Sequence, residues 1–198
     1  MFFSASQLVK SSASQILYFK TKKYKPEVTK NQIIGNKHAD KIVKQQKAAS
    51  EKRGIVKTKD FNILFSIDML KDNLAVEIKN VVGEYEQWYL ESSILQSTFY
   101  YTMLLQCKTL DTPKFRQIEG YPQEIVNIPD NIDFQLWFGD NKYQIFADYN
   151  VFSFYKDKAK VIFNSLNPID YDNVRTFDKI YKFNEYKHLK PHYEKIIT

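Results

Sequence analysis

The sequence is poor in residue types that several large classes of protein require. The chain of 198 residues contains one cysteine, Cys107, with five glycines and six prolines. A single thiol excludes a disulfide framework, a zinc site made of cysteines and an iron–sulfur cluster within one chain. So few glycines and prolines exclude collagen-like and glycine-rich repeat architectures.

Long hydrophobic runs are also lacking. No segment approaches the roughly 18 consecutive apolar residues that predict a membrane-spanning helix. Residues 1–15 have no basic stretch followed by a long apolar core, so they do not resemble a secretory signal. We therefore expect a soluble intracellular protein, in the cytoplasm of its own cell or of a host, without a membrane partner.

Aromatic residues, by contrast, are abundant, with 15 Phe, 14 Tyr and two Trp. This composition excludes a disordered chain, which has too little apolar surface to bury. The length suits one ordinary domain, and no repeat or change of composition marks a linker. We therefore expect a single domain over residues 1–198.

The charge is unevenly distributed along the chain. Residues 1–59 carry 14 Lys and Arg against three Asp and Glu, whereas residues 60–198 carry 15 against 20. A basic first third indicates an anionic partner, and nucleic acid is the usual polyanion. The alternative is that abundant Lys, with Asn, Ile and Tyr, is typical of AT-rich genomes and only solvates the surface.

Hydrophobic periodicity predicts both helices and strands. The pattern favours helices over 4–20, 31–52, 86–107 and 171–187, a loop over 21–30, and strands over 61–68, 74–79, 133–138, 142–147 and 160–163. We expect two hairpins, one joining 61–68 to 74–79 and one joining 133–138 to 142–147 around a turn at 139–141. The prediction is an α/β domain with a central mixed β-sheet flanked by helices.

Two carboxylates and a lysine are predicted to meet at the first hairpin. Asp68 ends one strand, while Glu77 and Lys79 lie two apart on the next and share a face of the sheet. Paired carboxylates form a hard-oxygen site for Mg²⁺ or Mn²⁺, which can polarise a phosphoryl oxygen and generate hydroxide from water. A neighbouring lysine can orient that water or neutralise developing charge.

The ordinary alternative for Glu-Ile-Lys is a strand with a polar outward face. Val76 and Ile78 lie on the other face, and Leu64 and Ile67 are near in sequence, which favours a strand within the core. Charged side chains on such a strand are costly unless they are paired or bound to metal.

Other polar residues accompany these charges. Gln96 and Tyr100 are spaced i, i+4 on the long predicted helix and therefore share a face, although such a pair is more often a helix surface. His38, just after Gly35, is largely neutral near pH 7 and can ligate a metal, although a lone histidine on a helix is more often packed or exposed.

Together and in this order, these motifs resemble the PD-(D/E)XK nuclease superfamily, in its RecB-type, lambda-exonuclease-like branch. SASQL at 4–8 is similar to the family's Ser-x-Ser-x-Leu start, and Gly35 to His38 resembles its Gly…His motif. Asp68 resembles the catalytic Asp, Glu77-Ile78-Lys79 the ExK motif, and Gln96-x-x-x-Tyr100 the QxxxY motif. The resemblance covers about 4–105, whereas 111–198 matches no known part and is expected to complete the sheet or contact a partner.

The resemblance implies a restriction-endonuclease-like core and divalent-metal-dependent phosphodiester hydrolysis. Asp68 and Glu77, with His38 and the backbone carbonyl of Ile78, would bind one or two Mg²⁺ or Mn²⁺ ions, without an iron–sulfur cluster. Lys79 would position the attacking water. Gln96 and Tyr100 would hydrogen-bond the substrate phosphate or Lys79.

Contacts to nucleic acid are expected from two further groups of residues. Lys20, Lys22, Lys23 and Lys25 form a dense basic run that can grip phosphates. Tyr85, Trp88 and Tyr89 can stack on unpaired bases at the mouth of the site. For Trp88 the favoured expectation is the ordinary one, in which it packs the helix onto the sheet.

The predicted function is a DNA nuclease, most simply an exonuclease acting on ends or single strands in DNA repair, recombination or replication. One alternative is an endonuclease, nickase or junction resolvase with the same core. A second is a nuclease fold that has lost catalysis and serves as a nucleic-acid-binding or inhibitory module, and a third is a structural or interaction protein in which the motifs are coincidence. An oligomer is compatible with the sequence, which defines no interface.

Overall fold

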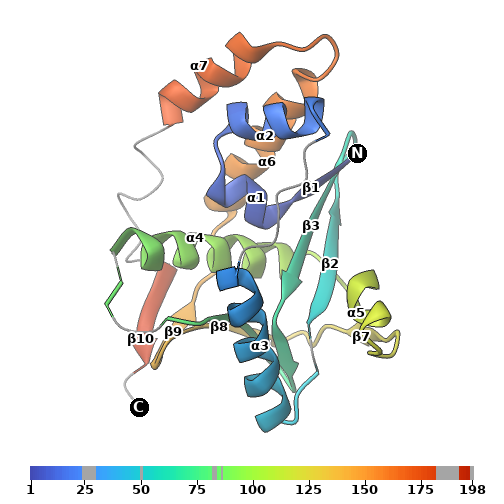
Figure 1. Ribbon diagram of the computed structural model, residues 1–198, viewed down its shortest axis with the longest axis vertical. Coiled ribbons are helices and arrows are strands. Elements are labelled where there is room, and N and C mark those ends of the chain that lie inside the picture. Colours follow the sequence, from blue (N-terminus) through green and yellow to red (C-terminus); the bar gives the residue numbers. More distant parts are fainter. Residues whose placement is uncertain (24–29, 50, 82–83, 86, 182–191, 197–198) are drawn as a thin grey trace.

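A computed structural model describes residues 1–23, 30–49, 51–81, 84–85, 87–181 and 192–196 of the chain. The described residues form an α/β structure with two mixed β-sheets flanked by helices (Figure 1). The expected α/β class and mixed strands are confirmed. The strands are divided between two sheets rather than gathered in one.

The first sheet is built around an antiparallel pair of central strands, β2 and β3. β1 extends it beyond β3 in parallel, and β6 and β7 extend it beyond β2 in antiparallel order. The strand bounds are β1 (Phe2–Ser4), β2 (Lys52–Lys57), β3 (Asn62–Ile67), β6 (Thr109–Asp111) and β7 (Ile125–Asn127).

The second sheet has the order β10-β9-β8-β5-β4, with β5 and β8 parallel and the other pairs antiparallel. Three of its strands come from the segment after residue 111, which matched no family motif. The bounds are β4 (Met69–Lys71), β5 (Leu74–Lys79), β8 (Asp133–Phe138), β9 (Asn141–Ile145) and β10 (Tyr193–Ile196).

Asp68 marks the point where the chain leaves the first sheet for the second. β3 ends at Ile67 and β4 begins at Met69. The expected hairpin between 61–68 and 74–79 is therefore wrong in part, because β5 pairs with β4 while β3 pairs with β1 and β2. Local sequence indicated the turn, at Asp72 with φ of +52°, but the partner of each strand depends on contacts distant in sequence.

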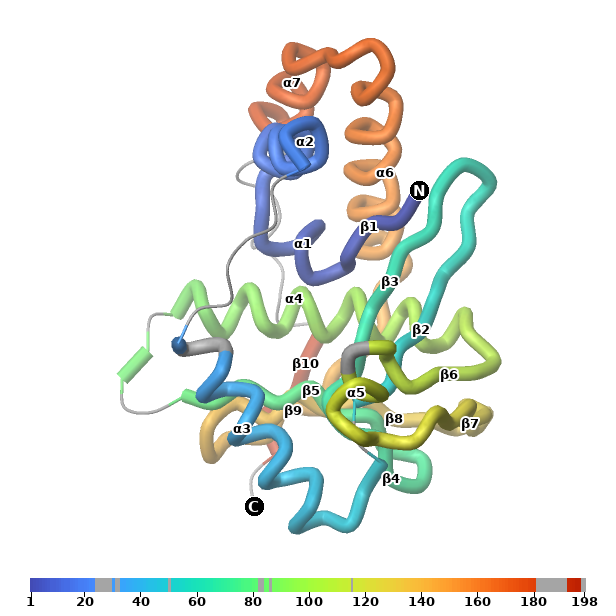
Figure 2. The backbone as a smooth tube through the Cα atoms, turned by 45° about the vertical axis from the view of Figure 1, so that its right-hand side comes forward, coloured from blue at the N-terminus to red at the C-terminus, as the bar shows by residue number. Residues whose placement is uncertain are grey.

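The longest helix, α4 (Gln87–Leu104), crosses the molecule and contacts strands of both sheets. Above it in Figures 1 and 2 lie α1 (Ala5–Lys10), α2 (Ala13–Thr21), α6 (Tyr149–Asn164) and α7 (Tyr171–Tyr181). α3 (Lys30–Gln45) lies on the other side of α4, and α5 (Lys114–Ile118) lies near β7. No helix in the described ranges is both long and apolar enough to cross a membrane.

The N-terminal helices differ from their predicted bounds. The helix expected over 4–20 is divided into α1 and α2, because the Ser12 hydroxyl accepts a hydrogen bond from the Gln15 N–H at 3.2 Å and caps a second helix. The helix expected to reach residue 52 ends at Gln45, and Lys52 begins the unexpected strand β2. Residues 24–29 of the expected loop lie outside the described residues.

The strand expected over 160–163 is wrong, since these residues belong to α6. Val161 and Ile162 favour a strand locally. The helix is set instead by Asp148, whose carboxylate caps it, and by buried residues at helical spacing, Phe152, Tyr155, Ala159 and Ile162.

The remaining expected elements are found with small differences. The hairpin of β8 and β9 turns at Gly139 with φ of +58°, as the Gly-Asp-Asn sequence predicts. The expected helices over 86–107 and 171–187 are α4 and α7, and residues 182–187 lie outside the described part of the chain.

Candidate active site

Glu77 and Lys79 form the centre of the candidate site on β5. Strand residues alternate between faces, so both side chains point toward α4 while Val76 and Ile78 point away. Glu77 is only 4% exposed. The Lys79 ammonium donates a hydrogen bond to Glu77 Oε1, which pairs the buried carboxylate with a cation.

Asp68 joins this pair from the point between the two sheets. Its Oδ2 accepts a hydrogen bond from the Ile78 N–H at 2.7 Å. The N–H and C=O of a strand residue point to the same side, so the Ile78 carbonyl is directed to the edge of β5 on which Asp68 lies. Burial and the neighbouring Glu77 raise the pKa of Asp68 to about 8, and Lys79 with the Ile78 N–H offsets only part of that shift.

Gln96 and Tyr100 bind to this group from successive turns of α4. Gln96 Nε2 donates to Glu77 Oε1 and to the Tyr100 hydroxyl, both at 2.9 Å. Both side chains are buried. Gln96 Oε1 is a buried acceptor without a hydrogen-bond partner among the described residues. The predicted Asp, Glu, Lys, Gln and Tyr side chains therefore come together in one connected group.

The protonation states of two members follow from this arrangement. Burial alone would lower the pKa of Lys79, but the attraction of Glu77 and Asp68 outweighs it and raises the pKa above its usual value. Burial, reinforced by the same carboxylates, raises the pKa of Tyr100 well above its usual range. Lys79 is therefore a cation and Tyr100 a neutral hydroxyl at neutral pH.

Packing behind Tyr100 holds it in place. The Phe65 ring lies 5.9 Å from the Tyr100 ring. On its other side, Phe65 approaches Gly54 on β2 so closely that an added Cβ would lie 2.3 Å from the ring. Gly54 therefore provides the space that lets Phe65 pack against Tyr100.

Two residues of α1 reach the site and were not predicted as site residues. Ser6, within the SASQL motif, hydrogen-bonds Tyr100. Lys10, the last residue of α1, is exposed, and partial desolvation followed by the charge of Lys79 lowers its pKa, while Glu77 and Asp68 act in the opposite sense. Lys10 thus adds a second ammonium near the carboxylates.

Glu51 is a third carboxylate near Asp68 and Glu77, and no sequence pattern predicted it there. It precedes β2, hydrogen-bonds Ser66, and has a pKa raised mainly by burial. Arg116 on α5 opposes that shift: its Nε lies 3.2 Å from Glu51 Oε2, and its guanidinium also binds Asp40 and Glu119. Asp40 and Glu51 are two of only three acidic residues in the first 59, a scarcity that could have drawn attention to them.

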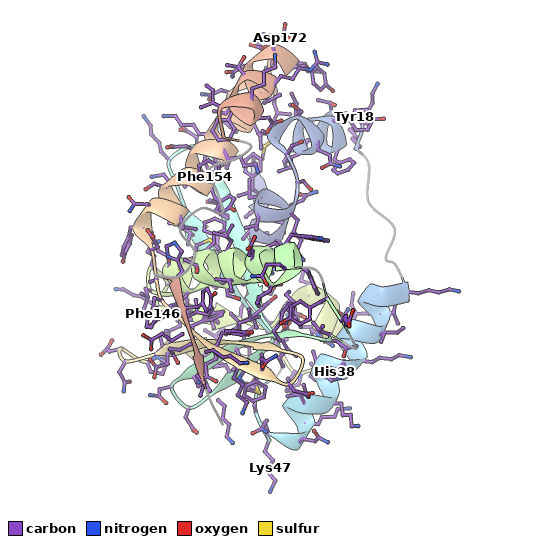
Figure 3. All side chains as sticks on the ribbon, turned by 90° about the vertical axis from the view of Figure 1, so that its left-hand side faces the viewer. Tyr18, His38, Lys47, Phe146, Phe154 and Asp172 are labelled. Carbon is purple, nitrogen blue, oxygen red and sulfur yellow. The ribbon has the colours of Figure 1, made fainter. Side chains whose placement is uncertain are left out.

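His38 is not brought into this group. It lies on α3, the helix at the lower right of Figure 3. Ala39 and Val43 of that helix pack with Val76 and Ile78, on the face of β5 opposite to Glu77. His38 therefore stays a predicted ligand without geometric support.

The predicted basic run has one member with a local role. The Lys20 ammonium donates to the Phe2 carbonyl at 3.0 Å and lies 4.4 Å from the centre of the Phe3 ring. Lys22 and Lys23 are exposed, and Lys25 lies outside the described residues. Within the described part of this basic run, Lys22 and Lys23 are therefore the exposed lysines that could contact a phosphate.

The aromatic residues before and within α4 divide into packed and exposed members. Tyr89 packs on Phe138, with ring centres 5.2 Å apart. Trp88 is 60% exposed and Tyr85 is 39% exposed. The expectation that Trp88 packs the helix onto the sheet is therefore wrong, because the next residue does so.

The donor set fits a hard divalent cation. Asp68, Glu77 and the Ile78 carbonyl supply oxygens, and the raised pKa of Asp68 reflects first its burial and then the neighbouring charge of Glu77. Mg²⁺ commonly takes one or two carboxylates and completes its coordination with water and phosphate. The described residues contain no group of three or more His, Cys, Asp and Glu arranged to hold a metal.

Comparisons of the chain with models of protein families, with curated proteins and with solved structures found no match.

Proposed function

We propose that this chain is a divalent-metal-dependent nuclease that hydrolyses DNA phosphodiester bonds, acting on ends or single strands. The observation that supports it most is the connected group of Asp68, Glu77, Lys79, Gln96 and Tyr100. These residues come from the junction between β3 and β4, from β5 and from α4. A stable fold without a use for them would incur a cost for burying their charges. We propose in addition that β2, β3, β5, β8 and α4 form a restriction-endonuclease-like core.

The proposed roles follow from the protonation states and contacts. Bound Mg²⁺ or Mn²⁺ supplies Lewis-acid polarisation of the phosphoryl group and lowers the pKa of coordinated water. Asp68, Glu77 and the Ile78 carbonyl would hold the ion. Lys79, as a cation, orients the attacking water and stabilises negative charge that develops at phosphorus. Gln96 fixes the Glu77 carboxylate, and its Oε1, which has no hydrogen-bond partner among the described residues, is available to accept a hydrogen bond from water.

The direct test is a cleavage assay on end-labelled linear duplex, linear single strand and closed circular DNA, with Mg²⁺, Mn²⁺ or EDTA. We expect metal-dependent loss of the linear forms while circles survive. Cut circles would favour the endonuclease or nickase alternative. Binding of DNA without cleavage by the folded protein would favour a nucleic-acid-binding module.

A second prediction concerns the stability of the metal-free protein. Because the folded-state pKa of Asp68 is about 8 and its unfolded value is about 3.9, the unfolded chain loses this proton first as pH rises. The free energy of unfolding in EDTA should therefore fall between about pH 4 and pH 8, by at least about 1 kcal/mol from this group. Urea unfolding across that range measures it.

The matched variant is Asp68→Asn, which can still accept from the Ile78 N–H. It should flatten this pH dependence and raise stability in EDTA at pH 8, while the rise in Tm that Mn²⁺ gives the wild type is lost. An unchanged Mn²⁺ response in Asp68→Asn would remove Asp68 from the metal site.

A further inference from the structure

The first turn of α4 presents an aromatic surface beside the candidate site. Tyr89 is close enough to Lys79 to raise its pKa, and it packs on Phe138. Tyr85 packs edge-on against the same Phe138, with ring centres 4.9 Å apart. α4 begins on the side of the molecule where β5 ends (Figure 2), so the surface adjoins Lys79.

Trp88 is the exposed part of this surface. Its ring centre lies 5.9 Å from that of Tyr89, and 60% of the residue is exposed. Burial of so large an apolar ring is favourable. The packed Tyr89 thus fixes the helix turn from which an indole faces solvent next to the proposed reaction centre.

The charges around Trp88 discriminate between two ways of contacting nucleic acid. Glu84, which is exposed, and Glu91, which is half-buried, lie within four residues of Trp88 in sequence. Carboxylates disfavour a close phosphate backbone, whereas the face of an unpaired base carries no charge and stacks on aromatic rings. The surface therefore suits a base better than a duplex backbone.

We propose that Trp88 stacks on an unpaired base next to the scissile phosphate, so that the substrate is a single strand or a frayed end rather than an intact duplex. The inference rests on the proposed nuclease function only for the position of the phosphate. Stacking itself is a binding property and can be measured without cleavage.

The experiment measures binding of a labelled single strand and of the matching duplex to the full chain in EDTA, by fluorescence anisotropy. Trp88→Ala should weaken binding of the single strand about tenfold and leave duplex binding within about twofold, and Trp88→Phe should restore most of the loss because it keeps an aromatic face.

Tyr149→Ala is the matched control. Tyr149 is also 60% exposed, and it follows Asp148, whose N–H donates to Thr102 Oγ1 near the other end of α4 at 2.9 Å. The fourteen residues from Trp88 to Thr102 span about 21 Å of helix. Tyr149→Ala should therefore bind like the wild type.

The chain has two tryptophans, so Trp137→Phe leaves Trp88 as the only tryptophan. With excitation selective for indole, its emission should be quenched by the single strand and not by the duplex. No single-strand binding by the wild type, equal losses for both ligands in Trp88→Ala, or equal losses in Tyr149→Ala would overturn stacking. A cleavage assay of the wild type separates the two hypotheses. If the wild type cleaves DNA but Trp88→Ala does not change single-strand binding, only the stacking proposal is refuted. If Trp88→Ala weakens single-strand binding selectively but the wild type cleaves no DNA, only the nuclease proposal is refuted.

Discussion

Replacing Lys79 with alanine is expected to reduce DNA cleavage at least about a hundredfold, the usual effect of removing one group that stabilises a charged transition state. Lys79 is the only described cation that hydrogen-bonds Glu77, and its raised pKa keeps it charged. Its loss should leave DNA binding within a few-fold of wild type, because one lysine would contribute only one of the several phosphate contacts on which binding depends. Single-turnover cleavage with Mg²⁺ or Mn²⁺, beside anisotropy with the same oligonucleotide, measures both quantities.

The control for this change is Lys71→Ala, which removes an exposed lysine at the end of β4 and should cleave like the wild type. Lys79→Ala also removes a buried counter-charge from Asp68 and Glu77, so the Tm of this variant in EDTA should be lower than that of the wild type. Mn²⁺ should then raise the Tm of Lys79→Ala by more than it raises the Tm of the wild type. Parallel loss of binding and cleavage in a folded Lys79→Ala protein would contradict the assigned role.

The parts of this site that could be predicted from sequence are those fixed by local periodicity. The two-residue repeat of a strand places Glu77 and Lys79 on one face, and the helix repeat places Gln96 above Tyr100. Gly139 likewise predicts the turn between β8 and β9. In each case the geometry depends on a few neighbouring residues, so the local sequence is sufficient to predict it.

Features that depend on distant segments could not be predicted in this way. β3 and β5 were expected to pair with each other, but β3 pairs in the first sheet and β5 in the second, because the pairing of strands depends on the whole core. Glu51, Lys10 and Arg116 approach the site from three separate segments. His38 belongs to a segment that resembles a family motif, but its helix covers the opposite face of β5.

The uneven charge along the sequence is balanced in part within the molecule. Lys52 is buried and binds Glu124 at 2.8 Å, and Arg53 binds Asp111 at 2.6 Å. Both cations belong to the basic first third and both carboxylates to the acidic remainder. These pairs therefore account for part of the asymmetry without an external anion, and the expectation of a nucleic-acid partner depends more on the site than on net charge.

Arg116→Met is expected to destabilise the protein by about 3 kcal/mol, the lower end of the range for breaking a buried ion pair by removing one partner. The Arg116 side chain is 8% exposed and binds Asp40, Glu51 and Glu119. Glu51 is the most buried of these carboxylates and already lies near Asp68 and Glu77. Without the guanidinium, Glu51 adds uncompensated charge to the site.

Urea unfolding at pH 7 measures this loss, and Arg175→Met provides the control. Arg175 forms one exposed pair with Asp172 at 3.5 Å, which should contribute little to stability. The double variant Arg116→Met/Glu51→Gln should recover much of the stability, since it removes the charge left without a partner. Lowering the pH should shrink the defect of Arg116→Met as the carboxylates take up protons, and a defect independent of both pH and Glu51 would show that Arg116 acts through packing. Arg116→Met should also slow cleavage, because Glu51 without its cation should draw Lys79 away from Glu77. The cleavage rate should recover in the double variant Arg116→Met/Glu51→Gln.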